Sequence, residues 1–176
     1  MSCRFIGVAP YAVRREARTG HDLPMLSQQE ISDRLELTDL MVRYSHAVDS
    51  RSWDDFDDIF TADATIDYSA FGGSTGSVTE TKAYLASVMP GFPAFQHLVS
   101  NPMLHIDGDA ATGRTMCFNP MAVARPDGDE GEPRVFFCGL WYLDRFVRTA
   151  DGWRIAERSE EKSWVHNMGP AFGGPA

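Results

Sequence analysis

Four long strand-like runs follow one another in the second half of the chain, and this succession constrains the fold more than any other feature. The runs cover Leu98 to Ile106, Ala110 to Ala124, Arg134 to Arg148 and Trp153 to Val165. The segments that join them contain Asp-Gly pairs, which favour tight turns between antiparallel strands. The pattern therefore predicts a long antiparallel meander with helices packed on one of its faces.

The first half of the chain supplies the predicted helices. Ser27-Gln-Gln-Glu30 is a capping-box pattern, which predicts a helix from there to about Asp49. Ser52 is expected to cap a short second helix, a strand is expected over 64–68, and a second capping box at 77–80 opens a later helix. This order predicts an α+β fold in which a curved, cone-shaped antiparallel sheet wraps around the N-terminal helices. The expected buried stripe of the first helix is Ile31, Leu35, Leu40, Met41, Tyr44 and Val48.

The length of 176 residues is typical of one domain with a sizeable core. We expect a single domain over residues 27–168, preceded by an N-terminal arm at 1–26 and followed by an irregular tail at 169–176. The arm lacks sustained periodicity, as terminal segments often do. Met25 is a candidate for the start of the protein, a point that the sequence leaves open.

Charge and composition argue against several classes of partner. The formal net charge of -9 repels phosphate backbones, so no nucleic acid is expected as a partner. No apolar run approaches the roughly 20 residues of a membrane span, so no membrane is expected either. The three cysteines lack paired spacing, and Cys117 and Cys138 lie in apolar runs where buried free thiols are expected. These features predict a cytoplasmic protein.

The sequence carries no motif for a metal, a nucleotide or another cofactor, and none is expected. The Gly-rich loop at 71–76 lacks the lysine and the spacing of a phosphate-binding loop. The five histidines show no zinc-binding spacing, and no Gly-x-Ser-x-Gly elbow is present. What remains for chemistry is a set of acids, tyrosines and one histidine.

Two of these residues stand out by position. Asp49 falls in the last turn of the first predicted helix, where the helix dipole disfavours a carboxylate. His97 opens the first long strand. Each also has a purely structural interpretation, because Asp49 could help form the turn into Ser52 and His97 could be a half-buried strand histidine.

Three short elements together resemble the SnoaL-like branch of the nuclear transport factor 2-like superfamily. They are Asp49-Ser-Arg-Ser-Trp53, Ile66-Asp-Tyr68 and Gln96-His97-Leu-Val-Ser-Asn101, and the resemblance extends over about residues 28–165. Within that group the chain looks most similar to the scytalone dehydratase and hexachlorocyclohexane dehydrochlorinase types. The resemblance implies a cone-shaped cavity with a dyad near its floor, formed here by Asp49 and His97.

The resemblance also implies roles for the tyrosines and the wall. A carboxylate that holds one imidazole nitrogen makes the other nitrogen a positioned base, and Tyr68 would help to polarise a substrate carbonyl through water. Tyr44 is expected to be a second hydrogen-bond donor. The residues expected to bind the substrate are Trp53, Phe71, Leu98, Asn119, Met121, Tyr142 and Trp164.

The chain departs from the dehydratase pattern at several positions, and Leu140 and Tyr142 stand near the places of a serine and an asparagine. Val48 replaces a tyrosine, and Met121 stands near the place of a second catalytic histidine. The pocket is therefore expected to be more apolar, with scytalone itself an improbable substrate. Dehydrochlorination is also doubtful, because cationic residues that would receive chloride are not clearly matched.

Three functions remain open at this level. The first is a cofactor-free lyase or isomerase acting on a hydrophobic cyclic or polyketide-like molecule. The second is a non-catalytic ligand-binding or assembly module on the same fold, and the third is the small subunit of a ring-hydroxylating oxygenase. The broad face of the meander, with Trp141 and Phe146 as candidates for packing, predicts a homodimer or homotrimer.

Overall fold

The computed structural model describes residues 25–123 and 133–169. The N-terminal arm expected at 1–26 lies outside this range apart from Met25 and Leu26, which are exposed. The tail at 169–176 lies outside it apart from Gly169, and so does most of the expected hairpin segment at 126–133.

Two α-helices begin at the predicted caps. Helix α1 spans Gln28–Ser50, and the side chain of Ser27 accepts a hydrogen bond from the backbone N–H of Glu30. Helix α2 spans Val78–Val88 and starts with a complete capping box between Ser77 and Glu80. A short 3₁₀ turn, η3 (Met89–Gly91), continues α2 into the segment that leads to His97.

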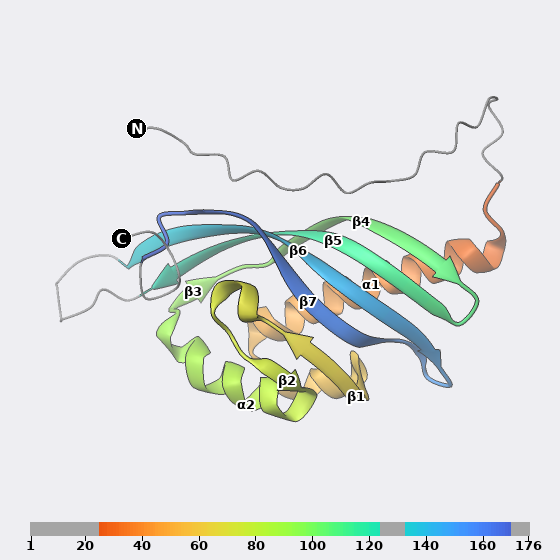
Figure 1. Ribbon diagram of the computed structural model, residues 1–176, viewed down its shortest axis with the longest axis horizontal. Helices are drawn as coiled ribbons and strands as arrows, with labels where there is room; N and C mark the ends of the chain where they lie inside the picture. The colour runs from red at the N-terminus through yellow and green to blue at the C-terminus, as the bar shows by residue number, and fades with distance from the viewer. Residues whose placement is uncertain (1–24, 124–132, 170–176) are drawn as a thin grey trace.

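The four long strands form the predicted meander. They are β4 (Leu98–Asp107), β5 (Ala110–Val123), β6 (Arg134–Thr149) and β7 (Gly152–His166). Neighbouring strands pair antiparallel along almost their whole length. They make a twisted, curved sheet with α1 running alongside it (Figure 1).

Shorter strands complete the sheet at both edges. β1 (Phe60–Asp67) pairs antiparallel with β2 (Thr75–Ser77), and β3 (Ala94–Phe95) pairs with the same edge of β5 as β4 does. The described residues thus form a seven-stranded sheet in the order β2-β1-β7-β6-β5-β3, with β4 also on β5. The strands β2 and β3 were not predicted, because runs of three and two residues carry too little periodicity to read.

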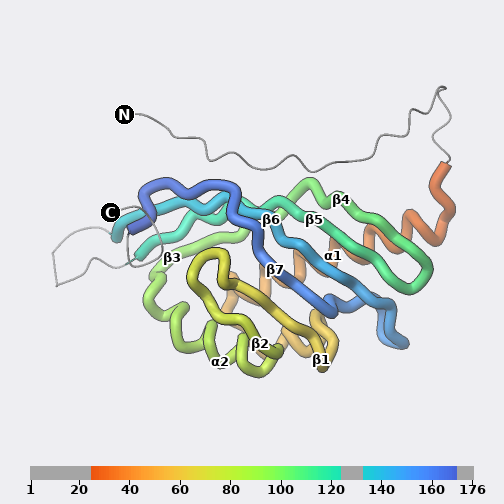
Figure 2. Tube along the Cα trace, in the orientation of Figure 1, coloured from red at the N-terminus to blue at the C-terminus, as the bar shows by residue number. Residues whose placement is uncertain are grey.

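The pairing of β1 with β7 is parallel, unlike the rest of the sheet. Ile66 lies opposite Arg158 and Asp67 opposite Ser159, so an early segment of the chain is joined to the last long strand. Figure 2 shows this neighbourhood, with β1 beside β7 and α2 on the other side of the β1–β2 pair. The α+β class is as predicted, whereas the expectation of a purely antiparallel sheet needs this correction.

Several local predictions for the first half are also corrected. Ile31 and Leu35 are 47% and 66% exposed, so the buried stripe of α1 begins further along, at Leu37. Ser52 precedes a 3₁₀ helix, η1 (Trp53–Asp58), and its side chain makes no capping hydrogen bond. The first two turns of α1 extend past the end of the core, which leaves their apolar side chains in solvent.

The core lies between α1, α2 and the concave side of the sheet. The largest fully buried side chains include Phe56, Tyr142 and Phe146. Phe146 was expected on an exposed face, but it points into the core, where it packs beside Gly113. In the described ranges no helix is long and apolar enough to cross a membrane.

Candidate active site

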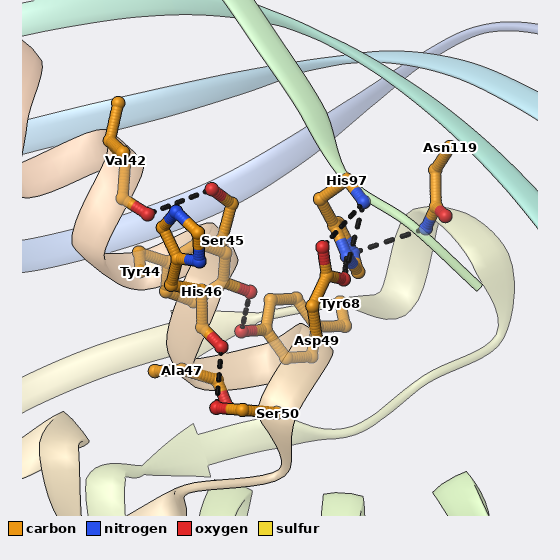
Figure 3. A network of polar contacts seen from close by, with 10 residues as sticks. All are labelled: Val42, Tyr44, Ser45, His46, Ala47, Asp49, Ser50, Tyr68, His97 and Asn119. Atoms are coloured by element: carbon orange, nitrogen blue, oxygen red, sulfur yellow. Dashed lines mark hydrogen bonds and ion pairs between the residues drawn. The ribbon is translucent and has the colours of Figure 1, made fainter. Parts of the chain in front are cut away.

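Asp49 and His97 form a close pair at the end of α1 (Figure 3). A carboxylate oxygen of Asp49 lies 2.7 Å from Nδ1 of His97, and the carboxylate also accepts the backbone N–H of His97 at 3.0 Å. The His97 side chain is only 7% exposed, whereas that of Asp49 is 27% exposed. The Asp49 carboxylate, which the helix dipole disfavours at this position, therefore holds both the backbone and the ring of His97 in place.

The local fold holds the two residues together. Arg51, which follows the helix, adopts a left-handed conformation with φ of 58°, and its N–H closes the last turn on Ala47 and Val48. The Arg51 side chain then donates hydrogen bonds to the backbone oxygens of Phe92 at 2.9 Å and Met89 at 3.3 Å. This bridge ties the end of α1 to the segment that precedes His97.

Asn119, on β5, occupies the other ring nitrogen of His97. The amide lies 3.1 Å from Nε2, and its nitrogen faces the ring in the orientation drawn in Figure 3. The exchanged orientation satisfies more groups, because the amide nitrogen then donates to the backbone oxygens of Gln96 at 3.0 Å and Pro120 at 3.2 Å. In that orientation the amide oxygen accepts a hydrogen bond from Nε2, so an oxygen acceptor lies beside each ring nitrogen of His97.

Tyr44 and Tyr68 meet through their hydroxyl groups, which lie 2.5 Å apart. Tyr44 comes from α1 and Tyr68 from the end of β1. Burial raises the pKa of Tyr44 to about 12 and that of Tyr68 well above its usual value, so both stay protonated. One of the two hydroxyls donates to the other, so the pair keeps one O–H that can donate to a ligand.

A cavity of about 340 Å³ lies between the helices and the sheet, and His97 and both tyrosines line it, with Asp49 behind His97. Of the other predicted substrate-binding residues, Phe71, Asn119, Met121 and Tyr142 also line it. The structure thus brings together residues from both halves of the chain. Further lining residues that were not among the predicted substrate-binding residues include Val48, Tyr84, Leu85, Val88, Phe92, Phe136, Cys138, Leu140, Glu160 and Met168.

Three of the predicted wall residues, Leu98, Trp164 and Trp53, do not line this cavity. Leu98 is 57% exposed and points away from the cavity, because it follows His97 on an extended backbone and successive side chains alternate. Trp164 is 47% exposed and packs against Phe118. Trp53 packs edge-on against Phe56 with ring centroids 6.0 Å apart.

Two charged residues near the cavity were missed altogether. Arg158 and Glu160 lie on β7, two positions apart and on the same side of the strand. Arg158 forms a buried two-point ion pair with Asp144 at 2.7 and 2.9 Å, and its guanidinium lies 3.9 Å from the Tyr44 ring centroid. Because Arg158 and Glu160 are two residues apart in a predicted strand, both could have been placed on the face that includes the cavity. The other charged residues of that strand instead suggested a solvent-exposed segment. Across residues 25–123 and 133–169, no group of three potential metal ligands lies together.

Comparison with known proteins places this site in a family context. The model of a SnoaL-like domain matches residues 29–159. An uncharacterized protein of Mycobacterium tuberculosis is 51% identical over 147 residues, which cover 84% of this chain and 97% of that protein.

Solved structures show the same fold at lower identity. A candidate scytalone dehydratase from Novosphingobium aromaticivorans aligns with a TM-score of 0.68 at 16% identity, covering 79% of this chain and 89% of its own. A hexachlorocyclohexane dehydrochlorinase from Novosphingobium barchaimii aligns with a TM-score of 0.65 at 18% identity, covering 78% and 91%. At these identities the likeness concerns the fold alone.

Proposed function

This chain belongs to the SnoaL-like domain family, and we propose that it is a lyase or isomerase that needs no cofactor. Asp49 and His97 would form its proton-transfer dyad. The reaction would begin with removal of a proton next to a carbonyl group, as in a dehydration. The folds shared with a dehydrochlorinase and a candidate dehydratase support this class of chemistry without defining the substrate.

The observation that carries the proposal is the 2.7 Å contact between Asp49 and Nδ1 of His97, whose ring lines the cavity. A carboxylate in this position keeps a proton on Nδ1 and stabilises the positive charge that the ring gains when Nε2 accepts a proton. Nε2 is the nitrogen on the Asn119 side, and both His97 and Asn119 line the cavity. A substrate proton can therefore reach the nitrogen that the carboxylate leaves free.

Asn119 controls when Nε2 becomes available. While its amide oxygen accepts a hydrogen bond from Nε2, that nitrogen holds a proton and cannot act as a base. Loss of that proton turns the contact between Nε2 and the oxygen into a repulsion between two lone pairs, so the amide must move away, because an amide that only turned would donate its own N–H to Nε2. The Nε2 lone pair is then open to the substrate.

The cavity restricts the substrate to a small and largely apolar molecule. A volume of about 340 Å³ is at the lower end of ligand pockets, which usually measure roughly 300–1,000 Å³. Phe71, Met121 and Leu140 supply apolar walls, while the Tyr44–Tyr68 pair offers one O–H donor to an oxygen. A cyclic ketone of one or two rings with a neighbouring hydroxyl group fits this description.

The test uses two bicyclic ketone probes. Wild-type protein should accelerate the exchange of the α-protons of 1-tetralone with D₂O, followed by NMR, and the dehydration of 3-hydroxy-1-tetralone to 1-naphthol, followed by fluorescence. His97→Ala should abolish both accelerations. His46→Ala, a change of the same type at an exposed position of α1, is the control. Equal rates for wild type and His97→Ala would contradict the proposal.

A second candidate, a ligand-binding module without catalysis, is favoured by one feature of the site. Both ring nitrogens of His97 have side-chain partners, as in a residue that only shapes a wall. Binding of 1-tetralone with no acceleration of either reaction would support this alternative. Calorimetry measures the binding of 1-tetralone to His97→Ala and His46→Ala. If the protein is an enzyme, His97→Ala should still bind the ketone but lose turnover; if it is a binding module, neither variant has turnover to lose.

A further inference from the structure

Glu160 carries a carboxyl group that lines the cavity. It lies on β7 opposite Tyr142 of β6 and lines the same cavity as His97. Within the described part of the chain, no donor makes a hydrogen bond to its carboxyl oxygens, in contrast to the well-paired carboxylates of Asp49 and Asp144.

The charged groups around Glu160 do not compensate for its burial. The guanidinium of Arg158 is held by Asp144, and the ammonium of Lys162 lies 4.9 Å from the ring centroid of Phe71. Asp67 adds a further unfavourable negative charge. Burial therefore raises the pKa of Glu160 to about 8, with Arg158 and Lys162 opposing the shift. The other titratable groups in electrostatic reach are Tyr44, Tyr68, Tyr84, Cys117, Cys138 and Tyr142.

The sheet separates Glu160 from the dyad by one strand. Asn119, the partner of His97, lies on β5, and Glu160 lies on β7, with β6 between them. Asn119 also lies four residues along β5 from Thr115, which is opposite Tyr142, so the backbones of Asn119 and Glu160 are roughly 17 Å apart. Cys138, Leu140 and Tyr142 of β6 form the cavity surface across this gap. His97 and Glu160 both line the cavity, so a substrate lying over β6 can place its α-carbon on the side of His97 and the neighbouring carbon, which carries the hydroxyl group, on the side of Glu160.

We propose that Glu160 is a second catalytic residue, a neutral carboxylic acid that protonates the oxygen leaving from the substrate. The proposal rests on the function proposed for Asp49 and His97. His97 takes the proton next to the carbonyl, and the electron pair of that C–H bond forms the new C=C bond. The C–O bond breaks with its electron pair on oxygen, and the Glu160 proton joins that oxygen to release water. The proton held by His97 returns to Glu160 through solvent.

The protonation state of Glu160 can be measured without any substrate. Protein labelled with ¹³C at the glutamate side-chain carboxyl carbon should show one resonance that keeps the chemical shift of a carboxylic acid at neutral pH. That resonance should titrate near pH 8 and be missing from Glu160→Gln. Titration of this resonance in the ordinary range of exposed glutamates would overturn the proposal.

The two ketone probes then separate acid catalysis from base catalysis. Glu160→Gln should slow dehydration of 3-hydroxy-1-tetralone by about 100-fold or more. The factor by which it slows α-proton exchange of 1-tetralone should be at least about ten times smaller. Glu161→Gln, the next residue along β7, which pairs with Arg114 at 2.8 Å, is the control. Equal slowing of both reactions, or of neither, would overturn the role of Glu160. If wild type accelerates neither reaction, the function proposed for the dyad fails, and the carboxyl titration still decides the state of Glu160.

Discussion

Arg158 places its guanidinium 3.9 Å from the ring centroid of Tyr44, while the same group holds Asp144 at 2.7 and 2.9 Å. A second ring, that of Tyr142, lies 4.3 Å from the guanidinium. Both ionic side chains are fully buried. The aromatic wall of the cavity therefore rests on a buried ion pair, and its shape depends on that pair staying intact.

Removal of Arg158 alone should destabilise the protein severely. Arg158→Met leaves the Asp144 carboxylate buried and uncompensated, so we expect a loss of about 3–5 kcal/mol in the free energy of unfolding. The double variant Arg158→Met/Asp144→Leu removes both charges and should recover most of that loss. Urea denaturation of the three proteins measures this. A double variant as unstable as the single one would show that aromatic packing, and not the unpaired charge, dominates.

Asp49→Asn should remove activity while leaving the fold intact. The amide cannot stabilise a charged imidazole, so turnover of the ketone probes should fall about 100-fold or more. Asp39→Asn makes the same change in charge at an exposed position of the same helix and should keep full turnover. Thermal unfolding verifies that both variants fold. A common loss of turnover in both variants would point to a change in helix stability instead of a loss of the dyad.

Asn119→Asp should move the acidic limb of the pH–rate profile to higher pH. A carboxylate at this position adds a second negative charge beside the His97 ring and favours its charged form, which cannot accept a proton. We expect a shift of about one pH unit or more. Asn101→Asp adds the same charge at an exposed position of β4 and serves as the control. A profile that does not move would rule out His97 as the titrating base.

Glu160 should make the protein less stable as the pH rises. Its pKa is raised from 4.5 in the unfolded chain to about 8 in the fold. Between these values the folded protein retains a proton that the unfolded chain releases, so stability falls with increasing pH over this window. Each unit of pKa difference corresponds to about 1.4 kcal/mol. Glu160→Gln should remove this dependence, as measured by denaturant unfolding across the pH range, and Glu161→Gln should leave it unchanged.

Cys117 and Cys138 should resist alkylation in the folded protein. Burial raises the pKa of the Cys117 thiol to about 12 and that of Cys138 to about 11, so the reactive thiolate is scarce at neutral pH. Peptide mapping after iodoacetamide treatment should find both unmodified in the native state and modified in guanidinium chloride. Rapid labelling of native Cys138 would mean that its strand opens to solvent.

The long strands could be predicted closely because their signals are local. The strands β4, β5 and β6 begin at Leu98, Ala110 and Arg134, as the Asp-Gly turns and apolar runs indicated. The parallel contact of Ile66 with Arg158 could not be predicted in this way. It joins segments far apart in the sequence, and no local pattern records which strand edge they share.

The residues that the family resemblance located lie together in the structure. Prediction failed where the direction of a side chain decides whether the residue lines the cavity. Leu98 could have been excluded, because it follows His97 and must face the opposite side of the strand. Trp164 is different. Lys162 lies opposite Leu140 but Trp164 lies opposite Gly139, so β7 carries one extra residue there. This irregularity turns Trp164 to the outer face, and the indole packs where a larger residue at 139 would clash.

The parallel contact between β1 and β7 also has a consequence for how the protein is made. The cavity is bounded by α1 and β1 on one side and by β7 on the other, and about ninety residues separate Ile66 from Arg158. During synthesis the early helices leave the ribosome long before the strand that completes their pocket. The apolar surfaces of α1 and β1 must then wait, uncovered, for the last strand. The site therefore cannot be complete until β7 has been made, and a nascent chain stalled before β7 would leave these apolar surfaces uncovered.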